Sequence, residues 1–242
     1  MEQTSIQHFV KIAKQTMIIK GVLKDVHDMT INHLKILTYL SDYEVNEDIK
    51  IRPLRRQEGW NDAQMTQLLT YLQSNGWFDK KRYYKDERQI VINLNASQQK
   101  RIHQFLNEIN QHMLLHVFEE HPSLTSTYGA IRYYFDCVNR MKRIQESVAR
   151  KLYTLDEMII LSMLLTNEDL TMSVKSLKIQ LESNTVKVNK IVKRLVTKDI
   201  IVKGRSPVDE RVVQLTIREE AAPLLRDIFT SILEKEMCSH VV

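Results

Sequence analysis

Apolar residues recur along this chain at helical spacing, and the same succession of segments occurs twice. Helices are predicted over about residues 3–24 and 129–152, and a further apolar helix follows Thr30 in the first half and Thr154 in the second. Each half continues with two short helices, then with alternating apolar and polar residues that predict a β-hairpin, and it closes with another helix. This order of elements is typical of a winged-helix domain built around a helix-turn-helix.

The tripeptide Asp-Glu-Arg supports a duplication, because it occurs at residues 86–88 and again at residues 209–211. The two copies lie 123 residues apart (209 − 86), and Thr30 and Thr154 lie 124 residues apart (154 − 30). Repeats of this length are too long for a solenoid and match two copies of one small domain. The predicted fold is mainly α with small β-hairpins, an α+β chain of two tandem winged-helix domains arranged as a pseudo-dimer. The predicted domains are residues 1–122 and 123–242.

Capping residues predict where several helices begin. Thr154 and Glu157 form a capping-box pattern, in which each side chain bonds the backbone amide of the other residue. His33 stands in place of the glutamate in the first half, so the sequence predicts only half a box there. Asn61 and Asn184 are predicted to cap the second short helix of their halves.

Composition limits the class of protein without identifying it. The 242 residues are 43% apolar and only 7% aromatic, which is enough for two modest cores. No apolar run is long enough to cross a bilayer, and the polar N-terminal segment does not resemble a signal peptide. A soluble cytoplasmic protein without a membrane partner is therefore expected. The two cysteines form no CxxC motif, which argues against a disulfide framework or a cysteine-rich zinc site.

The distribution of charge is more informative than the formal net charge of +5, which only suggests an anionic partner. Residues 185–205 contain seven cations and one acid, a local net charge of +6 (7 − 1). A helix with an outward polar face fits the major groove of DNA, where Gln pairs with adenine and Lys or Arg with guanine or phosphate. The outward faces predicted for the second short helices are Gln64, Gln67, Thr70 and Tyr71 in the first half and Lys187, Lys190, Lys193 and Arg194 in the second.

Further basic residues lie on the first short helix of the first half and on both predicted hairpins. A hairpin beside a major-groove helix can reach the flanking minor groove, which narrows and becomes more negative in A·T-rich tracts. We expect Asp86 and Asp209 to brace Arg88 and Arg211 by hydrogen bonding, and the alternative is a salt bridge that only holds the hairpin closed. The predicted DNA contacts outside the second short helices are Arg52, Arg55, Arg56, Arg82, Lys85, Arg88, Arg205 and Arg211.

The apolar helix after Thr30 or Thr154, the helix-turn-helix that follows and the Asp-Glu-Arg hairpin resemble the staphylococcal accessory regulator (SarA) family, a branch of the MarR-like winged-helix proteins. The duplicated layout over nearly the whole chain is similar to that of the family's two-domain members. The resemblance implies a cytoplasmic transcription factor that binds A·T-rich promoter double-stranded DNA and activates or represses virulence genes. It also implies that one chain acts as a monomeric pseudo-dimer, with further self-association left open. The second short helix of the first half departs from the basic pattern, because it carries no Lys or Arg.

Two other residue groups have both a functional and a structural interpretation. His112 and His116 lie four residues apart on a predicted helix and suggest a zinc or nickel site. Met113 and Val117 already occupy the inward face of that helix, so histidines at the surface or between the halves are favoured and no metal is expected. Cys137 lies on an apolar helix face, where a buried thiol is favoured over a redox-sensing thiolate.

The remaining alternatives are other classes of protein. The sequence has no glycine-rich phosphate loop, nucleophile elbow or HExxH motif, so neither an enzyme nor a cofactor is expected. A plasmid-type replication initiator with two winged helices is an alternative within DNA binding. A winged-helix scaffold that binds protein is the alternative outside it, and it requires an apolar patch where residues 187–205 carry charge.

Overall fold

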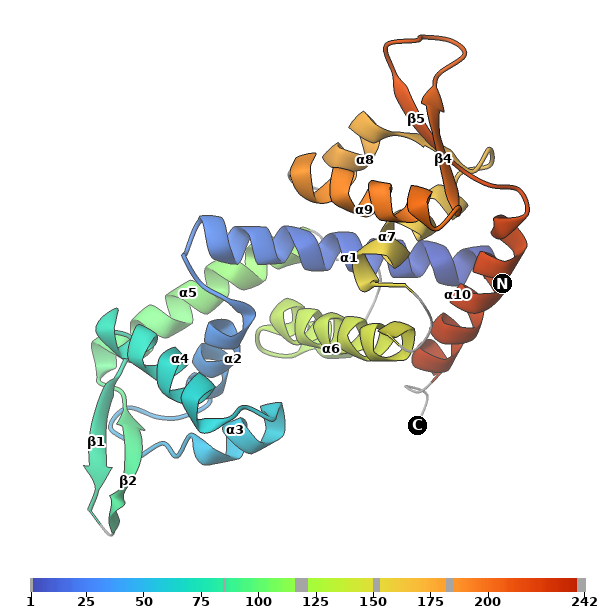
Figure 1. Cartoon of the computed structure of the whole chain (residues 1–242). Helices are drawn as coiled ribbons and strands as arrows, with labels where there is room; N and C mark the ends of the chain where they lie inside the picture. The colour runs from blue at the N-terminus through green and yellow to red at the C-terminus, as the bar shows by residue number, and fades with distance from the viewer. Residues whose placement is uncertain (1, 85, 116–121, 150–152, 182–184, 239–242) are drawn as a thin grey trace. The chain divides into compact units, whose positions relative to one another are not determined.

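The chain forms two compact units, each of which contains one winged helix (Figure 1). One unit consists of residues 20–132, and the other of residues 1–19 together with residues 133–242. The computed structural model describes residues 2–84, 86–115, 122–149, 153–181 and 185–238.

The chain passes from one unit to the other within two helices, α1 (Glu2–Asp25) and α6 (Gly129–Ala149). Both helices are predicted from the sequence, and their existence is confirmed. The units are defined by contacts, whereas the predicted domains follow the repetition of the sequence. The domain boundary between residues 122 and 123 therefore stays a prediction.

The unit of residues 20–132 contains the first winged helix. Its elements are α2 (Ile31–Leu40), α3 (Arg52–Glu58), α4 (Asp62–Ser74), β1 (Asp79–Tyr83), β2 (Asp86–Asn93), α5 (Ala96–Leu114) and the short 3-10 helix η1 (Pro122–Thr125). Helix α2 packs against both α4 and α5. The two strands pair antiparallel, with a register shift between Arg82 and Tyr83, and Ile49 forms an isolated bridge to Ile92.

The second winged helix lies in the other unit and has a larger sheet. Its elements are α7 (Leu155–Leu165), β3 (Thr171–Ser173), α8 (Val174–Leu181), α9 (Thr185–Thr197), β4 (Ile201–Arg205), β5 (Val213–Ile217) and α10 (Ala221–Cys238). The strand order is β3-β5-β4, and both pairs are antiparallel. Strand β3 is absent from the sequence prediction, since three residues are too few to reveal a period of two. Met172 of β3 pairs with Leu215, at the position that corresponds to the Ile49–Ile92 bridge of the first unit.

Helix α7 forms the centre of the second unit. Every residue from Glu157 to Leu165 is buried, which is the pattern of a helix surrounded by other elements. It packs against α9 and β5, and Phe229 of α10 is also fully buried. Burying one such leucine or phenylalanine side chain contributes roughly 1.5–3 kcal/mol, so α7 provides the platform on which the surface helices are held.

Helix α2 begins with a complete capping box, and the prediction of half a box is wrong. His33 Nδ1 accepts a hydrogen bond from the Thr30 amide (3.2 Å), and the His33 amide donates to Thr30 Oγ1 (3.5 Å). An unprotonated imidazole nitrogen is an acceptor, so it takes the place of the glutamate carboxylate. The His33 ring also stacks on Tyr71 of α4, with ring centroids 4.4 Å apart. Burial lowers the pKa of His33 below its ordinary value, and the nearby charge of Asp28 opposes this shift.

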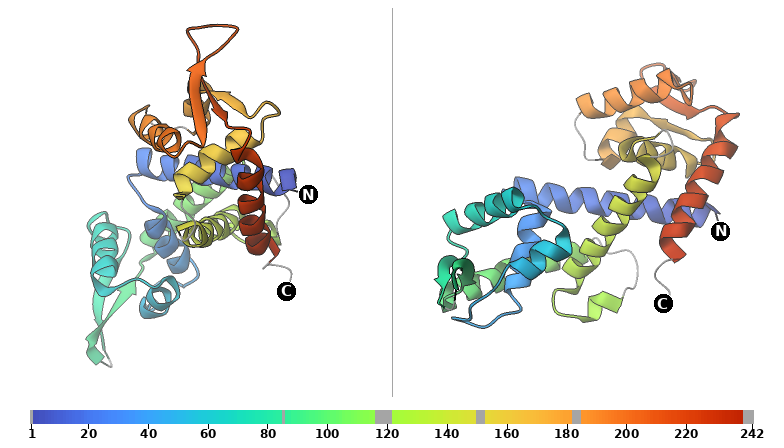
Figure 2. Two further views of the ribbon diagram at one scale, coloured as in Figure 1. Left: turned by 45° about the vertical axis from the view of Figure 1, so that its right-hand side comes forward. Right: turned by 60° about the horizontal axis from the view of Figure 1, so that its bottom comes forward.

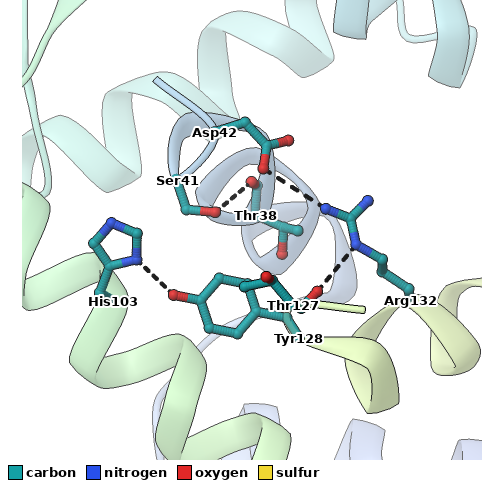
Figure 3. A network of polar contacts seen from close by, with 7 residues as sticks. All are labelled: Thr38, Ser41, Asp42, His103, Thr127, Tyr128 and Arg132. Carbon is teal, nitrogen blue, oxygen red and sulfur yellow. Dashed lines mark hydrogen bonds and ion pairs between the residues drawn. The ribbon is translucent and has the colours of Figure 1, made fainter. Parts of the chain in front are cut away.

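A network of polar contacts fixes the start of α6 within the unit of residues 20–132 (Figure 3). Arg132 pairs with Asp42 just beyond α2 (Nη2 to Oδ1, 3.6 Å), and its Nε donates to the Thr127 carbonyl (3.2 Å). Tyr128 has a left-handed backbone (φ 54°), and its hydroxyl is hydrogen-bonded to His103 Nδ1 of α5 (2.5 Å). These contacts join the segment before α6 to both α2 and α5, so polar pairs help to set where this helix begins.

The two Asp-Glu-Arg copies differ in backbone structure. Strand β2 begins at Asp86, so the first copy lies on a strand and not in the turn between the strands. The second copy lies in the connection between β4 and β5, which spans residues 206–212. The ladder extends to the pair Tyr83–Asp86 in the first hairpin but ends at Arg205–Val213 in the second, so only the first tripeptide lies within it. In Figure 1 and the left view of Figure 2, each hairpin projects beyond the helices of its own unit.

We predict that the chain loses stability through His33 as the pH falls. The Thr30 amide requires an unprotonated Nδ1, and the folded state lowers the pKa of His33. This contribution to the free energy of unfolding is complete above the ordinary pKa of 6.5 and is lost as the pH falls below it toward the lower folded-state pKa. Thermal unfolding of the wild type and of His33→Gln, followed from about pH 8 to about pH 5, measures it. Glutamine keeps an acceptor but does not titrate, so the wild type should lose more stability, and parallel curves would contradict the assignment.

Candidate nucleic-acid interface

Helix α9 separates an apolar inner face from a basic outer face. The inner side chains are buried where α9 packs against α7 and β4, and they are Val188, Ile191, Val192 and Leu195. Because a helix has 3.6 residues per turn, burying these positions leaves the intervening positions outward. The exposed cations of the helix are Lys187, Lys190, Lys193 and Arg194. Both faces of α9 are therefore oriented as the sequence predicts.

Glu157 links the start of α7 to the residue that follows α9. Its Oε2 accepts hydrogen bonds from the Thr154 amide (2.7 Å) and from Lys198 Nζ (2.9 Å), and the side chain is only 1% exposed. Burial of the carboxyl opposes ionisation, but the hydrogen bonds from Thr154 and Lys198 outweigh it and hold the pKa of Glu157 below its ordinary value. The Thr154 capping box is thus confirmed, and it also fixes one end of the basic helix.

Internal ion pairs reduce the charge that α9 offers to an outside partner. Lys187 Nζ lies 3.1 Å from Asp156 Oδ1, and Lys198 is held by Glu157. Within the described part of the chain, no ion pair with an acid involves Lys190, Lys193 or Arg194. The outward positive charge of α9 is therefore concentrated on these three residues.

A groove of about 430 Å³ lies between α8, α9 and the β4–β5 hairpin. It is lined by four cations from three elements, by Asn189 of α9 and by no acidic residue, and the cations are Lys175, Lys178, Lys203 and Arg211. Among the residues that the structure describes, none of these cations forms an ion pair with an acid. Like charges that line one groove repel one another, so the groove favours an anionic group.

Sequence reasoning missed two residues of this groove. Lys175 and Lys178 lie three residues apart on α8 and line the groove with Arg211, which lies in a different part of the chain. Their one-turn spacing was the available signal, because it puts both on the same side of a helix. Only the fold brings that side next to the hairpin.

Asp209 supports the second hairpin through the backbone. Its Oδ1 accepts a hydrogen bond from the Arg211 amide (2.9 Å), whereas the sequence predicted a contact with the arginine side chain. Arg205 at the end of β4 and Arg211 are both exposed. In the first hairpin, the predictions for Lys85 and for the side chains of Asp86 and Arg88 fall outside the described part of the structure.

The corresponding helix of the first unit, α4, presents a neutral face. Asn61 caps it as predicted, and Gln64 completes a capping box in which its Oε1 accepts from the Asn61 amide (3.1 Å). Gln64, Gln67 and Thr70 are exposed, whereas Tyr71 is only partly exposed, because one face of its ring stacks on His33. Pairing of Gln64 with adenine requires the same oxygen that caps α4. The expected cap of the other helix, Asn184, lies outside the described residues.

Positive charge in the first unit lies on α3 instead. A groove of about 560 Å³ is lined by Lys50, Arg52, Arg55 and Arg56, together with Asp62 of α4. Arg55 forms an ion pair with Asp62, which joins the two helices of the helix-turn-helix. Arg52 and Arg56 remain exposed, as does Arg82 on β1.

Comparison with known proteins identifies the family. The family model described as Transcriptional regulator SarA/Rot matches residues 18–105 and 144–228, which together exceed half of the chain. The chain belongs to the SarA/Rot family. The two matched regions correspond to the two winged helices, so the duplication and the resemblance expected from the sequence are both confirmed.

Individual relatives are more distant. Transcriptional regulator SarA of Staphylococcus aureus is 27% identical over 93 residues, which cover 38% of this chain and 74% of the relative, in strain Newman and equally in strain USA300. Among solved structures, wild-type MarR of E. coli has a TM-score of 0.42 at 15% identity and covers 46% of this chain and 82% of its own. AbsC, a MarR family transcriptional regulator from Streptomyces coelicolor, has a TM-score of 0.41 at 10% identity, with coverages of 46% and 77%.

Membership of the SarA/Rot family makes the chain a transcriptional regulator and not an enzyme. The described residues contain no group of three or more His, Cys, Asp or Glu residues that could hold a metal. Of the histidine pair considered from the sequence, His112 and His116, the second lies outside the described residues. Cys137 is fully buried, as the apolar helix face predicts. No helix in the described ranges combines the length and the apolar character that a membrane crossing requires.

Proposed function

We propose that this SarA/Rot-family chain is a regulator that binds double-stranded DNA and acts in the cytoplasm on A·T-rich promoters of virulence genes. The observation that carries the proposal is a set of cations on α9, α8 and the second hairpin that form no ion pair with an acid among the described residues, called the basic surface below. It consists of Lys190, Lys193 and Arg194 with the groove residues Lys175, Lys178, Lys203 and Arg211.

The shape of the basic surface favours duplex DNA over other polyanions. A helix with an outward basic face suits the major groove, and a hairpin beside it is suited to the flanking minor groove. Arg205 ends β4 and Arg211 lies in the connection of that hairpin, and arginine is attracted to the narrow minor groove of A·T-rich tracts. The virulence targets rest on the resemblance to the SarA family alone.

The two halves would contribute differently to binding. The basic surface of the second unit would supply most of the affinity that depends on counterion release. In the first unit, Gln67 and Thr70 of α4 would add register and base preference, while Arg52, Arg56 and Arg82 would contact phosphates. The halves are then not interchangeable.

Replacing two outward lysines of α9 tests the basic surface. Each phosphate contact contributes about −0.9 to the slope of log K against log salt, so Lys190→Ala with Lys193→Ala should flatten that slope by up to about 2 units. Gln64→Ala with Gln67→Ala should leave the slope nearly unchanged. Mobility shifts at a series of salt concentrations give both slopes, and equal slopes for the two double variants would remove the proposed asymmetry.

The same titration tests the groove. Lys175→Gln with Lys178→Gln should also flatten the slope by up to about 2 units if both lysines contact phosphates. Lys24→Gln with Lys100→Gln is the matched control, because it removes the same charge from exposed positions on α1 and α5. If both pairs change the slope equally, net charge and not the groove determines the effect.

One chain should bind as a pseudo-dimer. The helices α4 and α9, as the two recognition helices, would enter adjacent major grooves about 34–36 Å apart and would protect about two helical turns of DNA. Footprinting combined with the solution mass of the complex measures this, with promoter, plasmid-origin and random duplexes as separate targets. A footprint of one turn from a single chain would contradict the pseudo-dimer, and a preference for origin DNA would favour the replication initiator.

A further inference from the structure

We propose that Val208, at the end of the second hairpin, is a specificity-determining residue that contacts the floor of the minor groove and disfavours base pairs carrying the guanine 2-amino group. The inference rests on the proposed function, because it presupposes that this hairpin enters DNA. Val208 is 94% exposed, more than any other large apolar side chain in the described part of the chain.

A single exposed valine is ordinary on a protein surface, so its setting matters more than its exposure. Val208 lies in a connection held by four hydrogen bonds. Its amide donates to Ser206 Oγ (3.3 Å), the Ser206 amide donates to the Val212 carbonyl (2.9 Å), and Ser206 is only 6% exposed. The Val212 amide donates to the Asp209 carbonyl (2.9 Å), and the Arg211 amide to Asp209 Oδ1 (2.9 Å). The connection is therefore ordered before any partner binds.

Pro207 adds to this order. Its ring fixes the backbone angle φ immediately before Val208, which reduces the conformations open to the unbound connection. A β-branched side chain has few rotamers, so little entropy is lost when Val208 meets a partner. An exposed apolar group presented this rigidly is suited to a contact that depends on shape.

The charges around Val208 favour an apolar contact at the end of the hairpin and ionic contacts closer to its strands. Residues 206–210 include no cation, whereas Arg205 and Arg211 stand on either side of them. The Asp209 carboxylate is turned to the backbone, and DNA would repel the exposed Glu210. The Pro207–Val208 side is therefore the side of the connection that can enter a groove.

The minor groove differs between base pairs mainly in one group. A·T pairs present only the acceptors N3 and O2, while G·C pairs add the guanine 2-amino group, which protrudes from the floor. An apolar side chain against that amino group removes it from water without offering an acceptor, which costs binding free energy. Against an A·T floor Val208 meets no donor, and the flanking arginines can donate to the acceptors.

The two hairpins would differ in this property. The first carries Tyr84, 74% exposed, in its connection two residues before Asp86, where the second has Pro207 two residues before Asp209. A tyrosine hydroxyl both donates and accepts hydrogen bonds, so it tolerates an amino group. Discrimination against the amino group should therefore depend on the second hairpin.

The experiment uses four duplexes of one length, built from A·T, G·C, inosine·C or diaminopurine·T pairs. The A·T and inosine·C duplexes lack the minor-groove amino group, and the other two carry it. The major-groove edges group the same four duplexes in another way. Inosine·C resembles G·C in the major groove, and diaminopurine·T resembles A·T. Dissociation constants for the four duplexes thus separate minor-groove from major-groove recognition without a known operator.

The wild type should bind the two duplexes that carry the amino group more weakly, by on the order of 10-fold, as for a mismatched base pair. Val208→Ser offers an acceptor to the amino group, so the difference should fall to below about 3-fold. Its affinity for the A·T duplex and its salt slope should stay close to those of the wild type. Leu224→Ser is the matched control, since Leu224 is also exposed (61%) but lies on α10, and it should discriminate like the wild type.

Four results would overturn the proposal. If Val208→Ser retains the wild-type discrimination, that discrimination belongs to groove width sensed by the arginines. Affinities that group A·T with diaminopurine·T would assign it to the major groove. Failure of the wild type to bind any of the duplexes would remove the proposed function itself, and with it this inference. Binding with an ordinary salt slope but without discrimination would remove the inference alone.

Discussion

Burial of one face of α9 against α7 is the interaction on which the basic surface depends. Helix α7 is covered along its length, so its position is fixed by the core of the unit. When Val188, Ile191 and Leu195 pack in that core, the helical period leaves Lys190 and Lys193 no inward position. The packing of the core and the orientation of the charge therefore depend on the same contacts. A variant that weakens the packing of α9 on α7 also loses the fixed orientation of the outward lysines.

A polar tether supplements this packing in both units, but its chemistry differs. The N3 residue of each capping box contacts the second helix of the helix-turn-helix or the residue just after it. Glu157 accepts a hydrogen bond from Lys198, which follows α9, and His33 stacks on Tyr71 of α4. Apolar contacts alone would tolerate small sliding of one helix on another, whereas a hydrogen bond or a stacked ring specifies one register. The first unit relies on an imidazole whose pKa is lowered by burial, and the second on a buried carboxylate whose pKa is lowered by its hydrogen bonds, so acid should affect them differently.

Periodicity and capping residues predicted most of the fold, because they are local. The helices around Leu34 or Val188, the cap at Asn61 and the second hairpin follow from residues a few positions apart. The histidine capping box was missed because the usual pattern expects a carboxylate or amide. Strand β3 was missed because it is short and its pairing partner lies more than forty residues away in β5 (215 − 172 = 43). The Asp-Glu-Arg tripeptides have one sequence and two backbone settings, because strand pairing extends further in the first hairpin than in the second.

The sequence by itself determined that the chain is a duplicated winged helix, and that the later copy carries an amphipathic basic helix, because both are written in the spacing of residues along one segment. Only the tertiary structure decided which cations are available. Asp156 pairs with Lys187 and Glu157 binds Lys198, whereas Lys175 and Lys178 meet Arg211 across a groove without acids. Ion pairing depends on distances of a few ångströms between residues far apart in the chain, and folding alone sets those distances.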